Sequence, residues 1–244
     1  MNIFVTSSPY LDGADRAILN PENHFVENLR EVLPPFPRVL FVASDPERHD
    51  LTCSFVMDTA VAFCQAGMPF STFQVLDGTN ADRAAELVQS SDFLVLAGGH
   101  VPTQNSFFRQ IGLREILRDF QGTVMGISAG SMNLADMAYI QPEEEGEGVD
   151  PDFVRFAPGL GLTDVNILPH YQKCKDDILD GLRLFEDITY PDSQGNTFFA
   201  LPDGSYFFQN EEMLLLFGEG YVLRDGMLTP LTRSGDCLNM DEFQ

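Results

Sequence analysis

Short strand-like runs alternate with helical patterns through the first two thirds of the chain, and this alternation limits the fold more than any other feature. Apolar runs rich in β-branched and aromatic residues predict strands at 2–5, 38–43, 70–76, 92–97 and 123–127, of which those at 38–43 and 123–127 are expected to be buried. Apolar residues at helical spacing predict helices at about 50–66, from about 80, and at about 104–120. Because strands and helices that alternate in this way form parallel sheets with right-handed crossovers, we predict an α/β fold with a doubly wound, mainly parallel sheet and helices on both faces.

The last fifty residues follow a different pattern. Between Thr197 and Leu231, short apolar segments alternate with the turn sequences Pro202-Asp203-Gly204, Gly218-Glu219-Gly220 and Arg224-Asp225-Gly226. This pattern is typical of antiparallel strands. We expect these strands to continue or flank the sheet, so the whole chain, residues 1–244, is predicted to be a single α/β domain.

Charge and hydropathy exclude several classes of partner. The chain has 37 acidic and 14 basic residues, a formal net charge of −23, and so negative a surface repels nucleic acid and anionic lipid. No apolar run approaches the roughly 18 residues that a membrane span requires. The first eight residues lack the basic and apolar parts of a secretion signal. We therefore expect a cytoplasmic protein without nucleic acid or membrane partners.

The four cysteines, at positions 53, 64, 174 and 237, have neither metal-type nor redox-type spacing. Cys53 and Cys64 fall within the helix predicted at 50–66 and are expected to be small core residues. A structural zinc site is not expected. We predict no metal and no other cofactor.

The segment Gly126-Ile127-Ser128-Ala129-Gly130 matches the pattern G-x-S-x-G. It follows a predicted buried strand and opens a helical pattern, which is the setting of a nucleophile elbow. The glycines allow a strained turn that exposes the serine hydroxyl, and the Ala129 N–H can point at a developing oxyanion. We predict Ser128 as a nucleophile; the alternative is an ordinary glycine-rich turn that caps a helix.

A serine nucleophile needs a base, and the chain has four histidines. His24 and His49 lie in polar segments and are expected to be exposed, whereas His100 follows a glycine turn and could line a site. His170 ends the apolar run 165–169, at the expected end of the next strand. We predict that His170 meets Ser128 at the same edge of the sheet; the alternative is a hydrogen-bonded histidine without a catalytic role.

Two further parts of such a site are less defined by the sequence. A carboxylate must orient the imidazole, and the segment between serine and histidine offers several without distinguishing them: Asp136, Glu143, Glu144, Glu145, Glu147, Asp150 and Asp152. A second oxyanion donor is predicted at the glycine turn after the strand at 92–97, where the Gly99 N–H is the stronger candidate. An ordinary tight turn is the alternative there.

These motifs together resemble peptidase family S51, which contains aspartyl dipeptidase (peptidase E) and cyanophycinase. The resemblance rests on the order of four segments, Leu96-Ala97-Gly98-Gly99-His100, Gly126-Ile127-Ser128-Ala129-Gly130-Ser131, Leu168-Pro169-His170-Tyr171 and Tyr221-Val222-Leu223-Arg224-Asp225-Gly226. It implies a fold similar to class I glutamine amidotransferases and a Ser–His–Asp/Glu triad with Ser128 and His170. Counting from the serine implies Glu143 as the acid. Alignment on Val149-Asp150-Pro151 implies Glu145, which we place first.

The chain departs from this family pattern at two points. The dipeptidase grips an aspartate side chain with an arginine soon after the catalytic histidine, whereas here the corresponding segment offers Lys173, Lys175 and then Arg183, none of them in register. The Gly-Gly-Asn turn of the family ends in His100 here. We therefore take Lys173 and His100 as candidate substrate-binding residues and do not predict aspartate specificity.

We predict a serine-type, dipeptidase-like peptidase that hydrolyses small peptides, with a homodimer as one assembly to consider. Three alternatives remain open. A general esterase shares G-x-S-x-G, although Ser128 and His170 are close in sequence for that fold. A glutamine amidotransferase would need a cysteine at the elbow. A diverged relative that binds a small molecule or a partner protein would hold Ser128 and His170 far apart.

Overall fold

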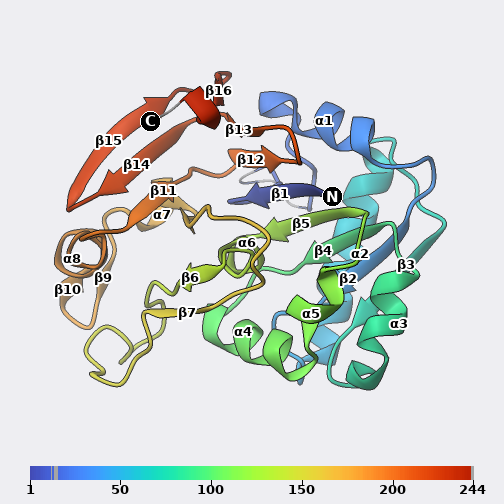
Figure 1. Cartoon of the computed structure of the whole chain (residues 1–244), viewed down its shortest axis with the longest axis horizontal. Helices are drawn as coiled ribbons and strands as arrows, with labels where there is room; N and C mark the ends of the chain where they lie inside the picture. The colour runs from blue at the N-terminus through green and yellow to red at the C-terminus, as the bar shows by residue number, and fades with distance from the viewer. Residues whose placement is uncertain (12, 14–15, 243–244) are drawn as a thin grey trace.

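The computed structural model describes residues 1–11, 13 and 16–242, and a central eight-stranded sheet organises it (Figure 1). The strands of this sheet are β1 (Asn2–Thr6), β2 (Arg38–Val42), β3 (Thr72–Leu76), β4 (Phe93–Leu96), β5 (Thr123–Ile127), β12 (Tyr206–Gln209), β13 (Leu214–Phe217) and β16 (Cys237–Asn239). Their order is β16-β13-β12-β1-β5-β4-β2-β3. The adjacent strands β1, β5, β4, β2 and β3 pair in parallel. Strands β12, β13 and β16 continue the sheet beyond β1, and each pairs antiparallel with its neighbour. This arrangement confirms the predicted fold class.

Helices cover both faces of this sheet because side chains alternate along its buried strands. Phe4 packs in one core with residues of α1 (Phe25–Val32) and α2 (His49–Gln65). Ile3 and Val5 face the opposite core, which contains residues of α3 (Ala84–Gln89), α4 (Val101–Gln110) and α5 (Leu113–Leu117). Short 3-10 helices precede α1 and α3, at Glu22–His24 and Ala81–Arg83, and another lies at Met240–Glu242.

A second, smaller sheet lies beside the first (Figure 1). It has the order β15-β14-β11-β8 and consists of β8 (Ile167–Leu168), β11 (Thr197–Ala200), β14 (Gly220–Arg224) and β15 (Met227–Thr232). Its first two strands in sequence, β8 and β11, are parallel, and the other pairs are antiparallel. The segment before His170 therefore joins this sheet instead of the edge of the main sheet where we expected it, because its partner is β11.

The remaining elements are short. Two hairpin-like pairs join β6 (Met137–Tyr139) to β7 (Phe156–Pro158) and β9 (Ile178–Leu179) to β10 (Leu182–Arg183). Single helical turns form α6 (Ala129–Met132), α7 (Tyr171–Cys174) and α8 (Tyr190–Asp192), and a π-helix spans Leu184–Thr189. Among the helices of the described residues, none is both long and apolar enough to cross a membrane.

Two details differ from the sequence-based expectations. The helix predicted at 104–120 is broken into α4 and α5 at Gly112, whose φ of 64° is left-handed. The placement of Cys53 and Cys64 in the core is wrong, because α2 buries Thr59 and Phe63 while Cys53 is half-buried and Cys64 is exposed. Leu51 and Phe55, in the N-terminal half of α2, line a cavity that also contains Ser128.

Candidate active site

The carboxyl ends of the parallel strands meet at one edge of the main sheet, where chemistry gathers in folds of this kind. Ser44 lies just after β2, Gly98 and Gly99 after β4, and Ser128 directly after β5. All four line a cavity of about 680 Å³, and His170 lines it with them. A volume of this size suits a small-molecule or short-peptide ligand.

Ser128 lies on a strained turn between β5 and α6, with φ 51° and ψ −110°. Its backbone N–H donates to the carbonyl oxygens of Thr6 and Ser7, at 3.1 and 3.0 Å, which tie the turn to the end of β1. The two glycines of the motif are required by close approach. A Cβ at Gly126 would lie 2.5 Å from the Ser131 nitrogen, and one at Gly130 would lie 2.3 Å from the Leu96 oxygen. The predicted elbow sequence thus forms a tight strand–turn–helix unit with the serine at its apex.

His170 and Ser128 are brought together as predicted. The His170 Nε2 atom lies 2.9 Å from Ser128 Oγ, a distance at which an imidazole can accept the hydroxyl proton. The histidine itself has a left-handed φ of 57°, and its N–H donates to Ser7 Oγ at 2.8 Å. This contact fixes the backbone of His170 against Ser7, directly after β1, and so helps to position the imidazole ring.

The carboxylate beside His170 is Asp203, which replaces the predicted Glu145 or Glu143. Asp203 Oδ1 lies 2.6 Å from His170 Nδ1. Glu143 instead accepts a hydrogen bond from the Val101 N–H at 3.2 Å, and Glu145 is exposed on its loop. The correction has a topological cause. Strands β8 and β11 pair in parallel with Leu168 opposite Ala200, so the residues that follow them, His170 and Asp203, emerge side by side.

The Asp203 side chain is largely buried, and both of its carboxylate oxygens have hydrogen-bond or ion-pair partners. Its side chain is 6% exposed and accepts hydrogen bonds from Ser7 Oγ at 2.9 Å and Gln172 Nε2 at 2.8 Å, and Lys173 Nζ lies 2.8 Å away. Burial opposes ionisation, but the contacts with His170, Lys173 and Ser7 outweigh it and hold the pKa of Asp203 far below its usual value. Lys173, predicted to bind substrate, thus faces the Asp203 carboxylate.

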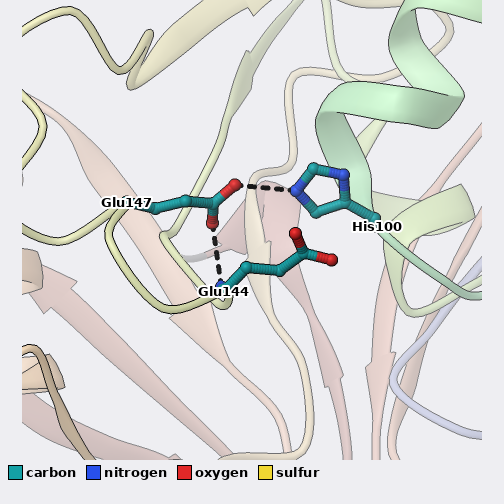
Figure 2. A group of neighbouring side chains, drawn as sticks. All are labelled: His100, Glu144 and Glu147. Atoms are coloured by element: carbon teal, nitrogen blue, oxygen red, sulfur yellow. Dashed lines mark hydrogen bonds and ion pairs between the residues drawn. The ribbon is translucent and has the colours of Figure 1, made fainter.

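The other predicted substrate-binding residue, His100, lines the cavity. Figure 2 shows its imidazole directed toward Glu147, with the Glu144 side chain below it. The ring nitrogens lie 2.7 Å from Thr103 Oγ1 and 2.8 Å from Glu147 Oε1, and the second oxygen of Glu147 accepts the N–H groups of Glu143 and Glu144. His100 therefore joins the acidic loop to the start of α4 at the cavity wall.

The same three side chains are a group that could hold a metal ion. One ligand atom from each of His100, Glu144 and Glu147 lies within 4.8 Å of the others. Both ring nitrogens of His100 already have hydrogen-bond partners, so an ion would have to separate Nε2 from Glu147. The absence of a metal requirement stays a prediction.

The predicted oxyanion donors lie at the ends of neighbouring strands. Gly99 lines the cavity with φ 151°, and a Cβ there would lie 2.5 Å from Ser44 Oγ, so the backbone passes very close to the loop after β2. Ala129 is the first residue of α6, where backbone N–H groups lack intrahelical acceptors. The roles of Gly99 and Ala129 remain predictions.

Comparisons with known proteins agree with this architecture. The family model of peptidase family S51 matches residues 14–216. A solved structure of a provisionally named peptidase E protein from Listeria monocytogenes EGD-e aligns with a TM-score of 0.59 at 15% identity, covering 95% of this chain and 98% of that chain, a likeness that shows the fold. A search of curated protein sequences gives no match. Since the family match spans most of the sequence, the chain belongs to peptidase family S51 and is a peptidase.

Proposed function

We propose that this protein is a serine-type peptidase of small peptides, with Ser128 as nucleophile, His170 as general base and acid, and Asp203 as the residue that orients His170. The observation that supports this most directly is the unbroken chain of contacts from Ser128 Oγ through His170 to Asp203, at 2.9 and 2.6 Å. Nucleophile, base and orienting acid in this order form the arrangement that activates a serine hydroxyl.

In the proposed reaction, His170 Nε2 takes the hydroxyl proton while Ser128 Oγ attacks the carbonyl carbon of the scissile bond. Asp203 is a carboxylate at neutral pH, so it accepts the Nδ1–H of His170 and stabilises the imidazolium that forms. His170 then donates its proton to the leaving amine. A water molecule, deprotonated by the same histidine, hydrolyses the acyl-enzyme and releases Ser128.

The negative charge on the carbonyl oxygen needs donors that are already in place. We assign this role to the N–H groups of Gly99 and Ala129, which belong to the turn after β4 and the first residue of α6. Backbone donors fixed by neighbouring strands need no reorganisation when the charge develops, and each such donor is worth roughly a hundredfold or more in rate.

The cavities beside Ser128 support a short peptide as substrate. The cavity of about 680 Å³ has an apolar wall that includes Phe41, Leu51 and Phe55, and a second cavity of about 340 Å³ also contains Ser128 and His170. The catalytic pair thus lies where two cavities meet. A peptide of a few residues could place one side of its scissile bond in each.

A diverged relative without activity would keep Ser128 and His170 apart, and their separation of 2.9 Å argues against it. The esterase alternative uses the same residues and differs in substrate. Turnover of simple aryl esters without turnover of any peptide would favour it.

The test compares wild type with Ser128→Ala, using a library of short peptides and a serine-directed fluorophosphonate. We expect wild type to hydrolyse some of the peptides and to be labelled at Ser128, and the variant to lose both properties. Ser106→Ala, on the exposed surface of α4, is the matched control and should keep both. A wild-type protein that is neither labelled nor active on peptides, or a Ser128→Ala protein that is still labelled, would contradict the proposal.

A further inference from the structure

A second group of nucleophilic and titratable side chains lies outside the Ser128 site. His49 Nε2 is 3.4 Å from Cys53 Sγ, and His49 Nδ1 is 2.5 Å from Asp77 Oδ2. Thiol, imidazole and carboxylate therefore follow one another in hydrogen-bonding order. Neither His49 nor Cys53 lines the two cavities that contain Ser128.

Local structure explains why these three residues meet. His49 and Cys53 are four residues apart at the start of α2, so both side chains lie on one face of the helix. Asp77 directly follows β3 and is buried, with its Oδ1 accepting both the N–H and the hydroxyl of Thr79, at 2.8 and 2.6 Å. The carboxylate is thus fixed by its own turn, and it fixes the imidazole in front of Cys53.

The charges around His49 favour its protonated form. The hydrogen bond and the charge of Asp77, which follows β3, raise the pKa of His49, and Asp50 on α2 adds to this. Burial raises the pKa of Asp77, but the hydrogen bonds from Thr79 and His49 outweigh it and leave the pKa lowered, so the carboxylate stays ionised. An imidazolium 3.4 Å from a sulfur atom stabilises the thiolate, which is the reactive form of cysteine.

We propose that Cys53 is a reactive cysteine, with His49, oriented by Asp77, as the group that takes the thiol proton, and is a site of covalent modification by soft electrophiles. In the reaction with an alkyl halide, the Cys53 sulfur forms a bond to carbon and the halide leaves with its electron pair. The proton that the thiol lost remains on His49. With a small disulfide, the same sulfur forms a mixed disulfide and expels a thiolate.

The chain supplies its own controls for this proposal. Cys64, on the same helix, and Cys237 are both exposed, whereas Cys53 is only half-exposed. Accessibility alone therefore predicts that Cys53 reacts more slowly than either. A faster reaction at Cys53 would have to come from its neighbours.

The experiment treats the folded full-length protein with iodoacetamide at pH 6 for short times and measures alkylation of each cysteine by peptide mass spectrometry. At this pH an unpaired thiol is almost entirely protonated, while an ion-paired thiol keeps a substantial thiolate fraction. After allowing for the lower nucleophilicity of a stabilised thiolate, we expect Cys53 to react about tenfold faster than Cys64.

His49→Gln keeps a polar side chain of similar reach but removes the charge. We expect it to bring the Cys53 rate down to that of Cys64, while the rates of Cys64 and Cys237 stay unchanged and report that the fold is intact. Asp77→Asn should lower the Cys53 rate in the same direction by a smaller factor. The proposal is overturned if Cys53 reacts no faster than Cys64 in wild type, or if His49→Gln leaves the ratio of the two rates unchanged.

Discussion

One buried serine at the end of β1 contacts every member of the proposed triad. The Ser7 hydroxyl donates to Asp203 Oδ1 at 2.9 Å and accepts the His170 N–H at 2.8 Å, and its carbonyl oxygen accepts the Ser128 N–H at 3.0 Å. These three residues come from distant parts of the sequence. Ser7 therefore fixes their relative positions, and the geometry at Ser128 depends on a residue that lines neither cavity.

Replacing Asp203 with asparagine tests the proposed role of Asp203 as the residue that orients His170. Without the carboxylate, the tautomer of His170 that accepts a proton from Ser128 is no longer favoured, and the imidazolium loses its counter-charge. We expect kcat on a peptide substrate to fall by about three to four orders of magnitude with little change in KM. Glu145→Gln, on the exposed loop outside both cavities, is the matched control and should retain activity within a few-fold. A Glu145→Gln protein as impaired as Asp203→Asn would instead restore the original prediction.

The depressed pKa of Asp203 also predicts how stability depends on pH. A carboxyl group whose pKa is lower in the folded than in the unfolded state stabilises the fold above its unfolded pKa, about 3.9, and loses this contribution as pH falls toward the folded value. The difference in unfolding free energy between wild type and Asp203→Asn should therefore be largest near neutral pH and shrink below about pH 4. Urea unfolding at several pH values measures it. A difference that is constant or that grows on acidification would contradict this assignment.

The sequence could indicate Ser128 and His170 because each has a local signal. The serine lies in a strand–glycine–helix pattern, and the histidine follows a short apolar run ending in proline. Asp203 has only a turn sequence, Pro202-Asp203-Gly204. It becomes recognisable once β8 and β11 are known to be parallel neighbours, and that pairing joins segments about thirty residues apart, as the Leu168–Ala200 register shows. Long-range pairing of this kind leaves no periodic trace in either strand.

Among the elements, the parallel strands of the main sheet could be predicted individually, whereas short strands such as β6 and β7 and most strand partners could not. The parallel strands β1, β2, β4 and β5 are largely buried on both faces, so each reads as a nearly continuous apolar run, whereas the edge strand β3 alternates exposed and more buried residues. The C-terminal strands were expected to continue or flank the sheet, and they do both. Strands β12 and β13 extend it, together with β16, which lies beyond the range in which strands were predicted, whereas β11, β14 and β15 form the second sheet with β8. The division depends on register between segments, which composition does not encode.

The elbow has little room for added side-chain atoms, and Gly130→Ala tests this. The added Cβ would lie 2.3 Å from the Leu96 carbonyl oxygen, a backbone atom of the neighbouring strand that cannot rotate away. We expect a loss of about 3 kcal/mol or more in unfolding free energy, together with slower fluorophosphonate labelling. Gly195→Ala is the control. An alanine at this position would be strained by the left-handed φ of 72°, but its Cβ would meet open space, so we expect a loss of only about 1 kcal/mol in unfolding free energy. Equal losses in urea unfolding would show that close packing at Gly130 is not the cause.

Charge is the property that belongs to the whole molecule. With a formal net charge of −23, folding brings many like charges together and raises the electrostatic energy of the compact state. Opposing this are surface ion pairs such as Arg38–Asp92 and Arg183–Asp187. Exposed pairs of this kind contribute about 0–1 kcal/mol each, and 14 basic residues cannot neutralise 37 acidic ones. Net repulsion should therefore dominate the response of stability to ionic strength.

We accordingly expect Tm to rise as salt is added. Raising NaCl from about 10 to 300 mM shortens the Debye length from roughly 30 Å to well under 10 Å, which screens repulsion across the surface more than it weakens contacts between paired atoms. Recovery of about 1 kcal/mol would raise Tm by about 2–4 °C in a chain of this size. Differential scanning calorimetry in NaCl and in KCl should give the same rise, since screening depends on ionic strength and not on the cation. A fall in Tm over this range would mean that the ion pairs, and not the acidic excess, control the electrostatic stability of the fold.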